Sequence, residues 1–340
     1  MKEISVRKRN RMLVLALFIV FICCFLVSFM IGRYPINPVD LIKVLLSKII
    51  HIEPTWSLEI ETVIFNIRLP RVIGGILVGA ALSVAGASYQ GLFRNPMVSP
   101  DVLGASAGAG FGAALGIFLS FSYFGISFSA FGFGLLTVAI VYIISNKVKN
   151  NPILGLILAG IMVSSIFTSA TSFLKLIADT DSVLPAITYW LMGSLASIRQ
   201  KDILFALVPI VIGILPLIVL RWRLNVLTMG EEEALTIGVN TKVIRVIVVV
   251  CATLITAASV SISGMIGWVG LVIPHFARMI VGDDYRVLLP ASMLMGASYL
   301  LLVDNFARTI STSEVPIGIL TAFVGAPFFL YLILREGRKQ

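Results

Sequence analysis

The sequence predicts an all-α polytopic membrane protein with about ten transmembrane helices. Hydrophobic residues make up 58% of the 340 residues and charged residues only 13%, whereas soluble domains carry roughly 25% charged residues. The apolar residues fall in separate runs along the whole chain, divided by short polar or Gly/Pro-containing segments. A helix needs about 20 apolar residues to cross a bilayer, so we expect a single transmembrane domain over residues 1–340.

The first predicted span is the apolar run Met12–Ile31, which follows the basic segment Lys2–Arg11. A cleaved signal peptide has the same order of charge and hydrophobicity, but its apolar core is shorter and a small-residue cleavage site follows it. No such site follows Ile31. We therefore expect an uncleaved first span that begins in the cytoplasm.

Four further spans are expected in the first half of the chain, with an amphipathic helix on the outer membrane surface before them. This amphipathic segment is Asn37–Ile50, in which Pro38 suits the first helical turn. Small residues on the second and third spans favour either rigid packing of close helices or the wall of a conduit. The spans are a segment that begins near Ile64, residues 102–120, Ile126–Ile144 and Ile153–Leu174.

Five spans are expected in the second half, after a polar and aromatic connection, Asp179–Gln200. The eighth span, Gly267–Ile280, is short and is interrupted by Gly270 and Pro274. Such spans are tolerated only where protein or a cavity covers the freed backbone groups. The remaining four are Ile203–Leu220, Val246–Ile262, Val287–Val303 and Ile317–Leu334.

The basic residues indicate the orientation of the chain. With ten spans and both termini in the cytoplasm, about two thirds of the 26 Lys and Arg residues fall in inner segments, as the positive-inside rule requires. The same basic loops, in contact with membrane lipid, explain the net charge of +9. We therefore expect no nucleic-acid partner.

A charged island, Arg221–Arg245, separates the sixth and seventh spans and lies on the cytoplasmic side in this topology. Thr228 and Glu231 have the spacing of a capping box, and Gly238 can end a helix in the left-handed conformation. The pattern predicts one short helix, Met229–Ile237, which cannot span a bilayer. A solvated loop and a docking element for a soluble partner are both compatible with it.

The motifs of common ATP-binding and catalytic sites are missing from the sequence. It contains no Walker A pattern, no H-E-x-x-H and no G-x-S-x-G. We therefore expect neither enzymatic activity nor a cofactor or metal in this chain. Acidic residues lie almost entirely at predicted span ends or in loops, whereas ion-coupled carriers usually place ionisable groups within the membrane. An ion-coupled carrier is thus disfavoured but stays open.

Hydroxyl groups recur at helical spacing on the fifth span, and two interpretations of them are open. They could line a water-accessible path, or they could bond to carbonyl groups of their own helix. These residues are Ser164, Thr168, Thr171 and Ser172.

Three arginines, Arg68, Arg71 and Arg308, lie at the outer ends of predicted spans. Arginines at such positions reach the lipid headgroups with their long side chains. Alternatively, the guanidinium fork suits salt bridges to carboxylates of an extracytoplasmic partner.

Five segments in order carry a resemblance to a known family. They are RLPRVIGGILVGAALSVAGASYQGLFRNPMVSPDVLG, ITYWLMGSL, LNVLTMGEEEALTIGV, GMIGWVGLVIPHFARMIVGDDYRVLLPAS and DNFAR…EVPIGILTAFVGAPFFLYLI. Together they resemble the permease subunit of iron–siderophore and cobalamin ABC importers, the FecCD type. The resemblance extends over nearly the whole chain from Arg68 onward, and several motifs in the right order make it specific.

The resemblance implies the fold and partners of a type II ABC importer in a prokaryotic cytoplasmic membrane. Two permease subunits, identical or paralogous, would form the pathway at their interface. Two cytoplasmic ATP-binding subunits would hydrolyse ATP, and an extracytoplasmic substrate-binding (lipo)protein would deliver the substrate. Transport would follow alternating access. A ferric siderophore is the first expectation for the substrate, with haem or cobalamin as alternatives.

The resemblance also implies roles for individual residues. The three outer arginines match positions that meet acidic residues of the binding protein. Asn95, Pro96 and Met97 match an inner-gate turn, in which Met97 stands where leucine is commoner. The residues that match the ATPase-coupling helices, within 221–241, are Leu224, Leu227, Gly230, Glu231, Glu232, Ala234, Leu235 and Gly238.

Overall fold

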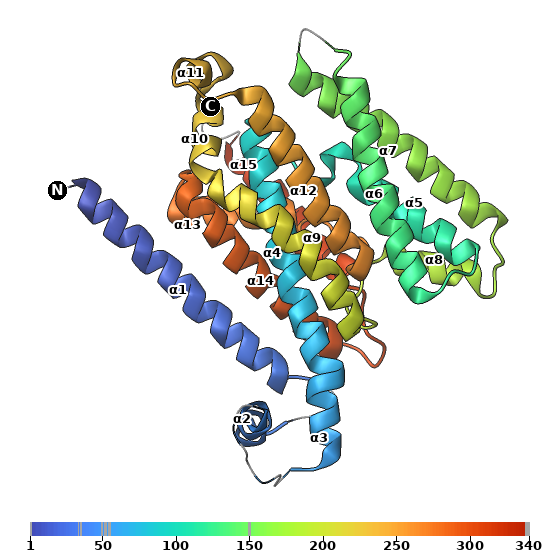
Figure 1. Cartoon of the computed structure of the whole chain (residues 1–340). Coiled ribbons are helices and arrows are strands. Elements are labelled where there is room, and N and C mark those ends of the chain that lie inside the picture. The colour runs from blue at the N-terminus through green and yellow to red at the C-terminus, as the bar shows by residue number, and fades with distance from the viewer. Residues whose placement is uncertain are drawn as a thin grey trace.

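The structure is a computed structural model that describes residues 2–32, 34, 36–48, 50, 53, 56–148 and 151–336. Every regular element within these residues is a helix, and together they form a bundle (Figure 1). The elements are α1 (Lys2–Met30), α2 (Pro38–Ser47), α3 (Leu58–Thr62), the π-helix η1 (Val63–Arg68), α4 (Leu69–Phe93), the 3-10 helix η2 (Pro100–Leu103), α5 (Ala105–Phe118), α6 (Tyr123–Ser145), α7 (Pro152–Ile177), α8 (Val183–Leu191), α9 (Gln200–Val219), α10 (Arg221–Met229), α11 (Glu231–Thr236), α12 (Thr241–Ser263), α13 (Val269–Val281), α14 (Tyr285–Thr309) and α15 (Ile317–Glu336).

Seven helical segments among the described residues are long and apolar enough to cross a membrane. They are α1, the continuous run from α3 through η1 to α4, and α6, α7, α9, α12 and α14. Three shorter apolar helices, α5, α13 and α15, stand where the third, eighth and tenth spans were predicted. The predicted all-α polytopic architecture is therefore confirmed.

α4 runs through the middle of the bundle (Figure 1) and is buried along its whole second half, from Val78 to Phe93. It packs against α12, α13 and α14. On one side α5, α6 and α7 form a second group that contacts α12, and on the other side α1 lies against α14. Neighbouring helices therefore fix the position of α4 along the bundle.

Glycine residues allow the backbones of α4, α13 and α14 to approach closely. A Cβ atom on Gly86 would lie 1.7 Å from the carbonyl oxygen of Gly270, and one on Gly79 would lie 2.3 Å from that of Gly296. Only hydrogen atoms fit in such contacts, which is why small residues mark close helix pairs in membranes. These contacts support the packing interpretation of the small residues on α4.

The bundle has two ends, which we call the α11 end and the α2 end after the helices that lie there (Figure 1). The start of α1, the last turn of α4 and the end of α15 lie at the α11 end. η1 and the connection between α14 and α15 lie at the α2 end. Both ends of the described chain are thus on the same side of the bundle.

Two segments outside the long spans test the predicted boundaries. α2 confirms the amphipathic helix, and Asn37 caps it by accepting a hydrogen bond from the amide of Val39 at 3.1 Å. The connection predicted over Asp179–Gln200 lies between α7 and α9 and contains a short helix, α8, that was not predicted. Ile187 of α8 is buried against residues of α5 and α7, so packing stabilises a helix that is too short to be recognised as a span.

We predict that Gly86→Ala destabilises the bundle, because its methyl group would overlap the backbone of Gly270. Overpacking of this kind costs about 1–3 kcal/mol, so the midpoint of thermal unfolding in detergent should fall. Gly132→Ala is the matched control, since a Cβ there meets nothing within 4 Å. Equal midpoints for the two variants would contradict close packing of α4 on α13.

Candidate functional site

Segment 221–238, which matches the coupling helices of the resembled family, contains two helices instead of the predicted one. α10 ends at Met229, and Gly230 follows with φ +146°, a backbone conformation that favours glycine. α11 then runs for six residues, and Gly238 follows with φ +81°, the left-handed conformation that was predicted. The helix predicted over Met229–Ile237 is therefore confirmed as α11 but is shorter than predicted, because Gly230 separates it from Met229, which ends α10.

The predicted capping box is wrong. The hydroxyl group of Thr228 donates to the carbonyl oxygen of Asn225 at 2.7 Å, within α10. The carboxylate of Glu231 accepts from Nη2 of Arg245 and from the hydroxyl of Thr241, each at 3.0 Å. A charge-assisted bond to a guanidinium is stronger than one to a backbone amide, so Glu231 links α11 to α12.

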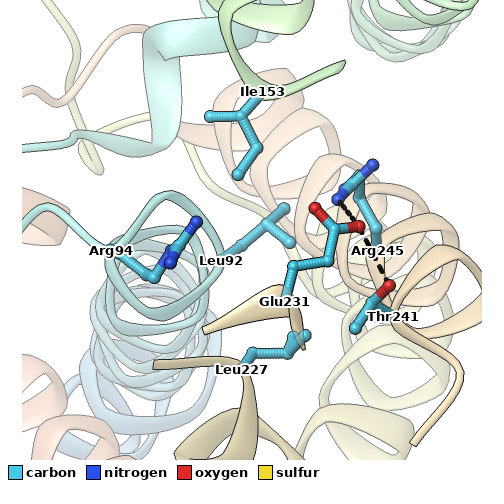
Figure 2. A pocket seen from close by; sticks show the side chains of 7 residues that line it. All are labelled: Leu92, Arg94, Ile153, Leu227, Glu231, Thr241 and Arg245. Carbon is cyan, nitrogen blue, oxygen red and sulfur yellow. Dashed lines mark hydrogen bonds and ion pairs between the residues drawn. The ribbon is translucent and has the colours of Figure 1, made fainter. Parts of the chain in front are cut away.

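Figure 2 shows this contact in a small pocket at the α11 end. The Glu231 side chain lies between Arg245 and Thr241 of α12. The end of α4, the start of α7 and α10 complete the lining, through Leu92, Arg94, Ile153 and Leu227. The first turn of α11 is therefore held against several helices of the bundle.

Burial divides the residues of segment 221–238 into an anchoring set and an exposed set. Leu224 and Ala234 are fully buried, and Leu227 is 8% exposed. By contrast Met229, Leu235 and Ile237 are 64%, 59% and 54% exposed. Glu232 and Gly238 are exposed as well. Burial thus separates the side chains that hold the segment to the bundle from those that face away from it.

The turn 94–99, which contains the predicted gate residues, joins α4 to η2. Arg94 ends α4 in the left-handed conformation with φ 51°, and the Asn95 side chain accepts from the Met97 amide at 2.9 Å. Asn95, Pro96 and Met97 are exposed, whereas Val98 is buried. The turn therefore has a fixed internal geometry, an exposed tip and a buried anchor.

η2 places a carboxylate beside this turn that the sequence analysis did not single out. Asp101 accepts a hydrogen bond from the hydroxyl of Ser106, at the start of α5. Although Asp101 keeps exposed surface, desolvation by the surrounding protein raises the pKa of its carboxyl group, and the Ser106 hydroxyl opposes that shift. Asp101 directly follows Pro100 in the NPMVSPD stretch, and this position is the sequence feature by which it could have been singled out.

The hydroxyl groups predicted to line a path bond in part to their own helix, as the second interpretation proposed. Thr171 donates to the carbonyl of Phe167 at 2.8 Å, and Ser172 donates to that of Thr168 at 3.0 Å. Thr171 is buried and Ser164 is half-buried, whereas Thr168 and Ser172 are exposed on α7. A path-lining role thus stays a prediction, and the exposed pair is best placed for it.

The three arginines predicted at outer span ends are buried at the α2 end. Arg68, Arg71 and Arg308 expose only 3%, 6% and 6% of their area, so the interpretation that they reach lipid headgroups is wrong. Arg68 donates to the backbone carbonyls of Phe29 and Tyr34. These contacts tie η1 to the end of α1 and to the residues that follow it.

Two carboxylates within the chain neutralise the other arginines. Nη2 of Arg71 lies 2.8 Å from Asp304, and its Nη1 lies 2.9 Å from Glu314. Nε of Arg308 lies 3.2 Å from the second oxygen of Asp304. Asp304 and Arg308 are four residues apart in the DNFAR motif, a helical spacing that brings side chains together, so the sequence contained an indication that was missed.

The comparison with known families decides what kind of protein this is. The model of the FecCD transport family matches residues 18–335. The chain belongs to the FecCD transport family. The FecCD match extends over nearly all of the helical bundle and confirms the resemblance found in the sequence. It makes the chain a membrane-embedded permease of an ABC importer, which removes the alternative of an ion-coupled carrier.

Individual relatives from the FecCD family match this chain closely, but their names refer to different substrates. The molybdate import permease MolB of Haemophilus influenzae is 42% identical over 92% of this chain and 94% of its own. A probable iron chelatin permease of Helicobacter pylori is 42% identical over 84% and 86%. The cobalamin import permease BtuC of Halobacterium salinarum is 42% identical over 80% and 73%. The family is therefore clear, whereas the relatives disagree on cargo.

A solved structure supports the fold of this FecCD permease. It is an inward-facing conformation of a transporter described as metal-chelate type ABC, with a TM-score of 0.85 and 40% identity. The match covers 95% of this chain and 98% of that one. The type II importer fold implied by the sequence is thereby confirmed.

We predict that Asp304→Asn strongly destabilises the protein, because it leaves two buried guanidinium groups short of a counter-charge. Removal of one partner from a buried ion pair costs about 3–5 kcal/mol. Lys48→Gln is the control, since it breaks the exposed Lys48–Glu61 pair at 2.8 Å, and such pairs contribute about 0–1 kcal/mol. Thermal unfolding in detergent should rank the variants in this order, and a small effect of Asp304→Asn would contradict the stabilising role of the pair.

Proposed function

We propose that this FecCD permease is the membrane domain, over residues 1–340, of an ATP-driven importer in a prokaryotic cytoplasmic membrane. Both termini would be cytoplasmic, so the α11 end would face the cytoplasm and the α2 end the outside. The distribution of basic residues along the chain supports this orientation. The orientation places segment 221–238 where a soluble ATPase can reach it.

Segment 221–238 would dock two cytoplasmic ATP-binding subunits, one on each permease of a pair. The observation that carries this proposal is the exposed apolar set Met229, Leu235 and Ile237, which lies at the end of α10 and along α11, the short helix that Glu231 fixes to α12. A surface that is apolar and also rigidly attached can transmit movement into the bundle. ATP hydrolysis would then be the task of the partner, and this chain would be no enzyme.

A second permease, identical or paralogous, would complete the pathway. Thr168 and Ser172 are exposed on α7 among large apolar side chains, of which Phe173 and Leu176 are 60% and 80% exposed. Hydroxyl groups gain more from water than from lipid, so we place this face toward a partner and a wet path. Opening and closing of the path would involve turn 94–99, whose tip is exposed.

The α2 end would receive an extracytoplasmic substrate-binding (lipo)protein. Three buried arginines lie there with two carboxylates, of which Asp304 pairs with Arg71 and Arg308 and Glu314 pairs with Arg71, so the cluster keeps a positive charge beneath the surface. Such a field attracts an acidic partner surface. Direct contact with Arg68, Arg71 or Arg308 would require rearrangement of their present pairs.

The proposed cargo is an iron chelate, with a ferric siderophore first and haem or cobalamin as alternatives. The iron chelatin and cobalamin relatives support this class. The relative named for molybdate adds a second candidate, a small oxyanion, that the sequence analysis did not consider. Delivery by the binding protein, and not the permease alone, would decide between them.

We predict that Leu235→Asp abolishes productive docking of the ATP-binding subunits. Leu235 is 59% exposed, so a charge there should leave the fold intact while it opposes an apolar contact. Gly230→Pro should act in the same way, because proline fixes φ near −65° and cannot reproduce φ +146°. Co-purification of the ATP-binding subunits, followed by their ATPase activity, measures the effect.

Leu58→Asp is the control for this experiment, because Leu58 is 82% exposed but lies on α3 at the α2 end. It should retain the partner fully. Capture of the ATP-binding subunits at wild-type levels by Leu235→Asp would contradict docking at this surface.

We predict that the complete importer takes up a ferric siderophore and not molybdate. The complex, with its own binding protein, is reconstituted in proteoliposomes and supplied with ATP and radiolabelled cargo. Uptake of ⁵⁵Fe-chelate without uptake of ⁹⁹Mo-molybdate would support the proposed cargo. The reverse result would overturn the choice of cargo but not the role as an importer.

A further inference from the structure

A chain of polar side chains crosses the α11 end of the bundle, from α10 to turn 94–99. It begins at Asn225 on α10 and passes through Tyr285 at the start of α14. It continues through Arg278 in the last turn of α13 and ends at Gln90 on α4. None of these side chains belongs to the sites predicted from the sequence, and they join four helices, of which α4 and α10 are far in sequence from α13 and α14.

The first contact fixes α10 to the start of α14. The amide nitrogen of Asn225 donates to the carboxylate of Asp284 at 2.6 Å, and its amide oxygen accepts from the backbone N–H of Tyr285 at 2.7 Å. Because the amide nitrogen faces an acceptor and the amide oxygen faces a donor, only this orientation of the Asn225 side chain makes both hydrogen bonds. Arg221 adds a bond from the same helix to the carbonyl of Arg286 at 3.1 Å.

The second contact joins the start of α14 to α13 and α4. Tyr285 is 3% exposed, and Nη2 of Arg278 lies 3.5 Å from its hydroxyl oxygen. A Cβ atom on Gly91 would lie 2.9 Å from the same oxygen, so the ring packs directly on the backbone of α4. Nε of Arg278 also pairs with Asp283 at 3.1 Å.

The third contact ends at turn 94–99. Gln90 is 2% exposed, and its amide oxygen accepts from Nη2 of Arg278 at 3.2 Å. Its amide nitrogen donates to the carbonyl oxygens of Val98 and Leu271, at 3.4 and 3.3 Å. The backbone carbonyl of Gln90 accepts from the amide of Asn95 at 3.1 Å. One residue therefore holds both sides of the turn.

Polar contacts of this kind resist independent movement of the helices that they join. Gln90 and Tyr285 are buried, and a buried donor or acceptor that loses its partner destabilises the protein. A shift of α10 therefore either moves the start of α14 and Arg278 with it or breaks several bonds.

We propose that Asn225, Arg278 and Gln90 are positioning residues that make the location of turn 94–99 depend on the location of α10. The proposal rests on the proposed function, in which α10 and α11 follow the ATP-binding subunits and the turn controls the inner end of the path. It adds the physical connection between the two. Tyr285 and Asp284 are the intermediate contacts.

Gln90→Glu is the variant that interrupts this connection most selectively. The carboxylate still accepts from Arg278, but it cannot donate to the carbonyl of Val98. Asn225→Asp interrupts the other end, because it places a second carboxylate against Asp284. Ser88→Ala is the matched control on α4, since the Ser88 hydroxyl is buried without a partner among the described residues.

The test follows the turn directly and needs no knowledge of the cargo. Met97 is 38% exposed, and Met97→Cys is introduced into a variant in which Cys23, Cys24 and Cys251 are replaced by alanine. The complex with the ATP-binding subunits is then labelled with a maleimide, with and without a non-hydrolysable ATP analogue. Nucleotide should change the labelling rate in the otherwise unaltered protein and in Ser88→Ala.

In Gln90→Glu and in Asn225→Asp the nucleotide effect should shrink by at least about threefold, the size of change that coupling residues cause. The double variant should be no worse than the more severe single one, because both interrupt one chain of contacts. A nucleotide effect of wild-type size in both single variants, or losses that multiply in the double variant, would overturn the proposal.

Two further measurements distinguish loss of the polar connection from unfolding of the variant and from an incorrect proposed function. Thermal unfolding shows whether each variant remains folded, and Asn225→Asp lies at a partly exposed position where that is expected. Co-purification shows whether the ATP-binding subunits still bind. Retained binding with a lost nucleotide effect supports the polar connection. Lost binding in Leu235→Asp, with a normal nucleotide effect in Gln90→Glu, would support docking and reject the connection.

Discussion

Close backbone contact around α4 is the constraint on which the rest of the structure depends. Glycines place the backbone of α4 directly against those of α13 and α14, near Gly270 and Gly296, and these contacts leave little room for sliding. α4 begins beside the buried arginine cluster and ends at turn 94–99. Because one rigid helix carries both features, the packing that positions one end also positions the other.

Polar groups at the two ends of the bundle solve the same physical problem in different ways. At the α2 end, charges that would be costly in an apolar environment are paired, as in the contact of Arg71 with Asp304. At the α11 end, amide and guanidinium groups form consecutive hydrogen bonds. The side chain of Gln90 on α4 bonds to Arg278 and Leu271 of α13 and to Val98 of the turn. Both arrangements add polar contacts between helices that close packing already holds together.

Periodicity and composition were sufficient for the spans, because each long apolar run has only one structure that satisfies its backbone in a membrane. They were insufficient where partners from distant segments decide the local structure. Glu231 has the spacing of a capping residue but finds Arg245, fourteen residues away on α12. Likewise the arginines at span ends look like headgroup anchors until Asp304 and Glu314 are brought beside them by the fold. The order of the motifs was enough to indicate the family, but the resemblance contained no information on which side chains are paired within the chain.

The break at Gly230 has a consequence for protein engineering. Residues 230–238 form a small unit, with a glycine of positive φ at each end, and the polar side-chain contacts that hold its helix to the bundle are those of Glu231 with Arg245 and Thr241. Because both polar partners lie on α12, the unit can be exchanged between related permeases with little redesign of the spans. If the unit docks the ATP-binding subunits as proposed, chimaeras made at this boundary would change which ATPase a given permease accepts, provided that the recipient has an arginine and a hydroxyl group at the matching places on α12.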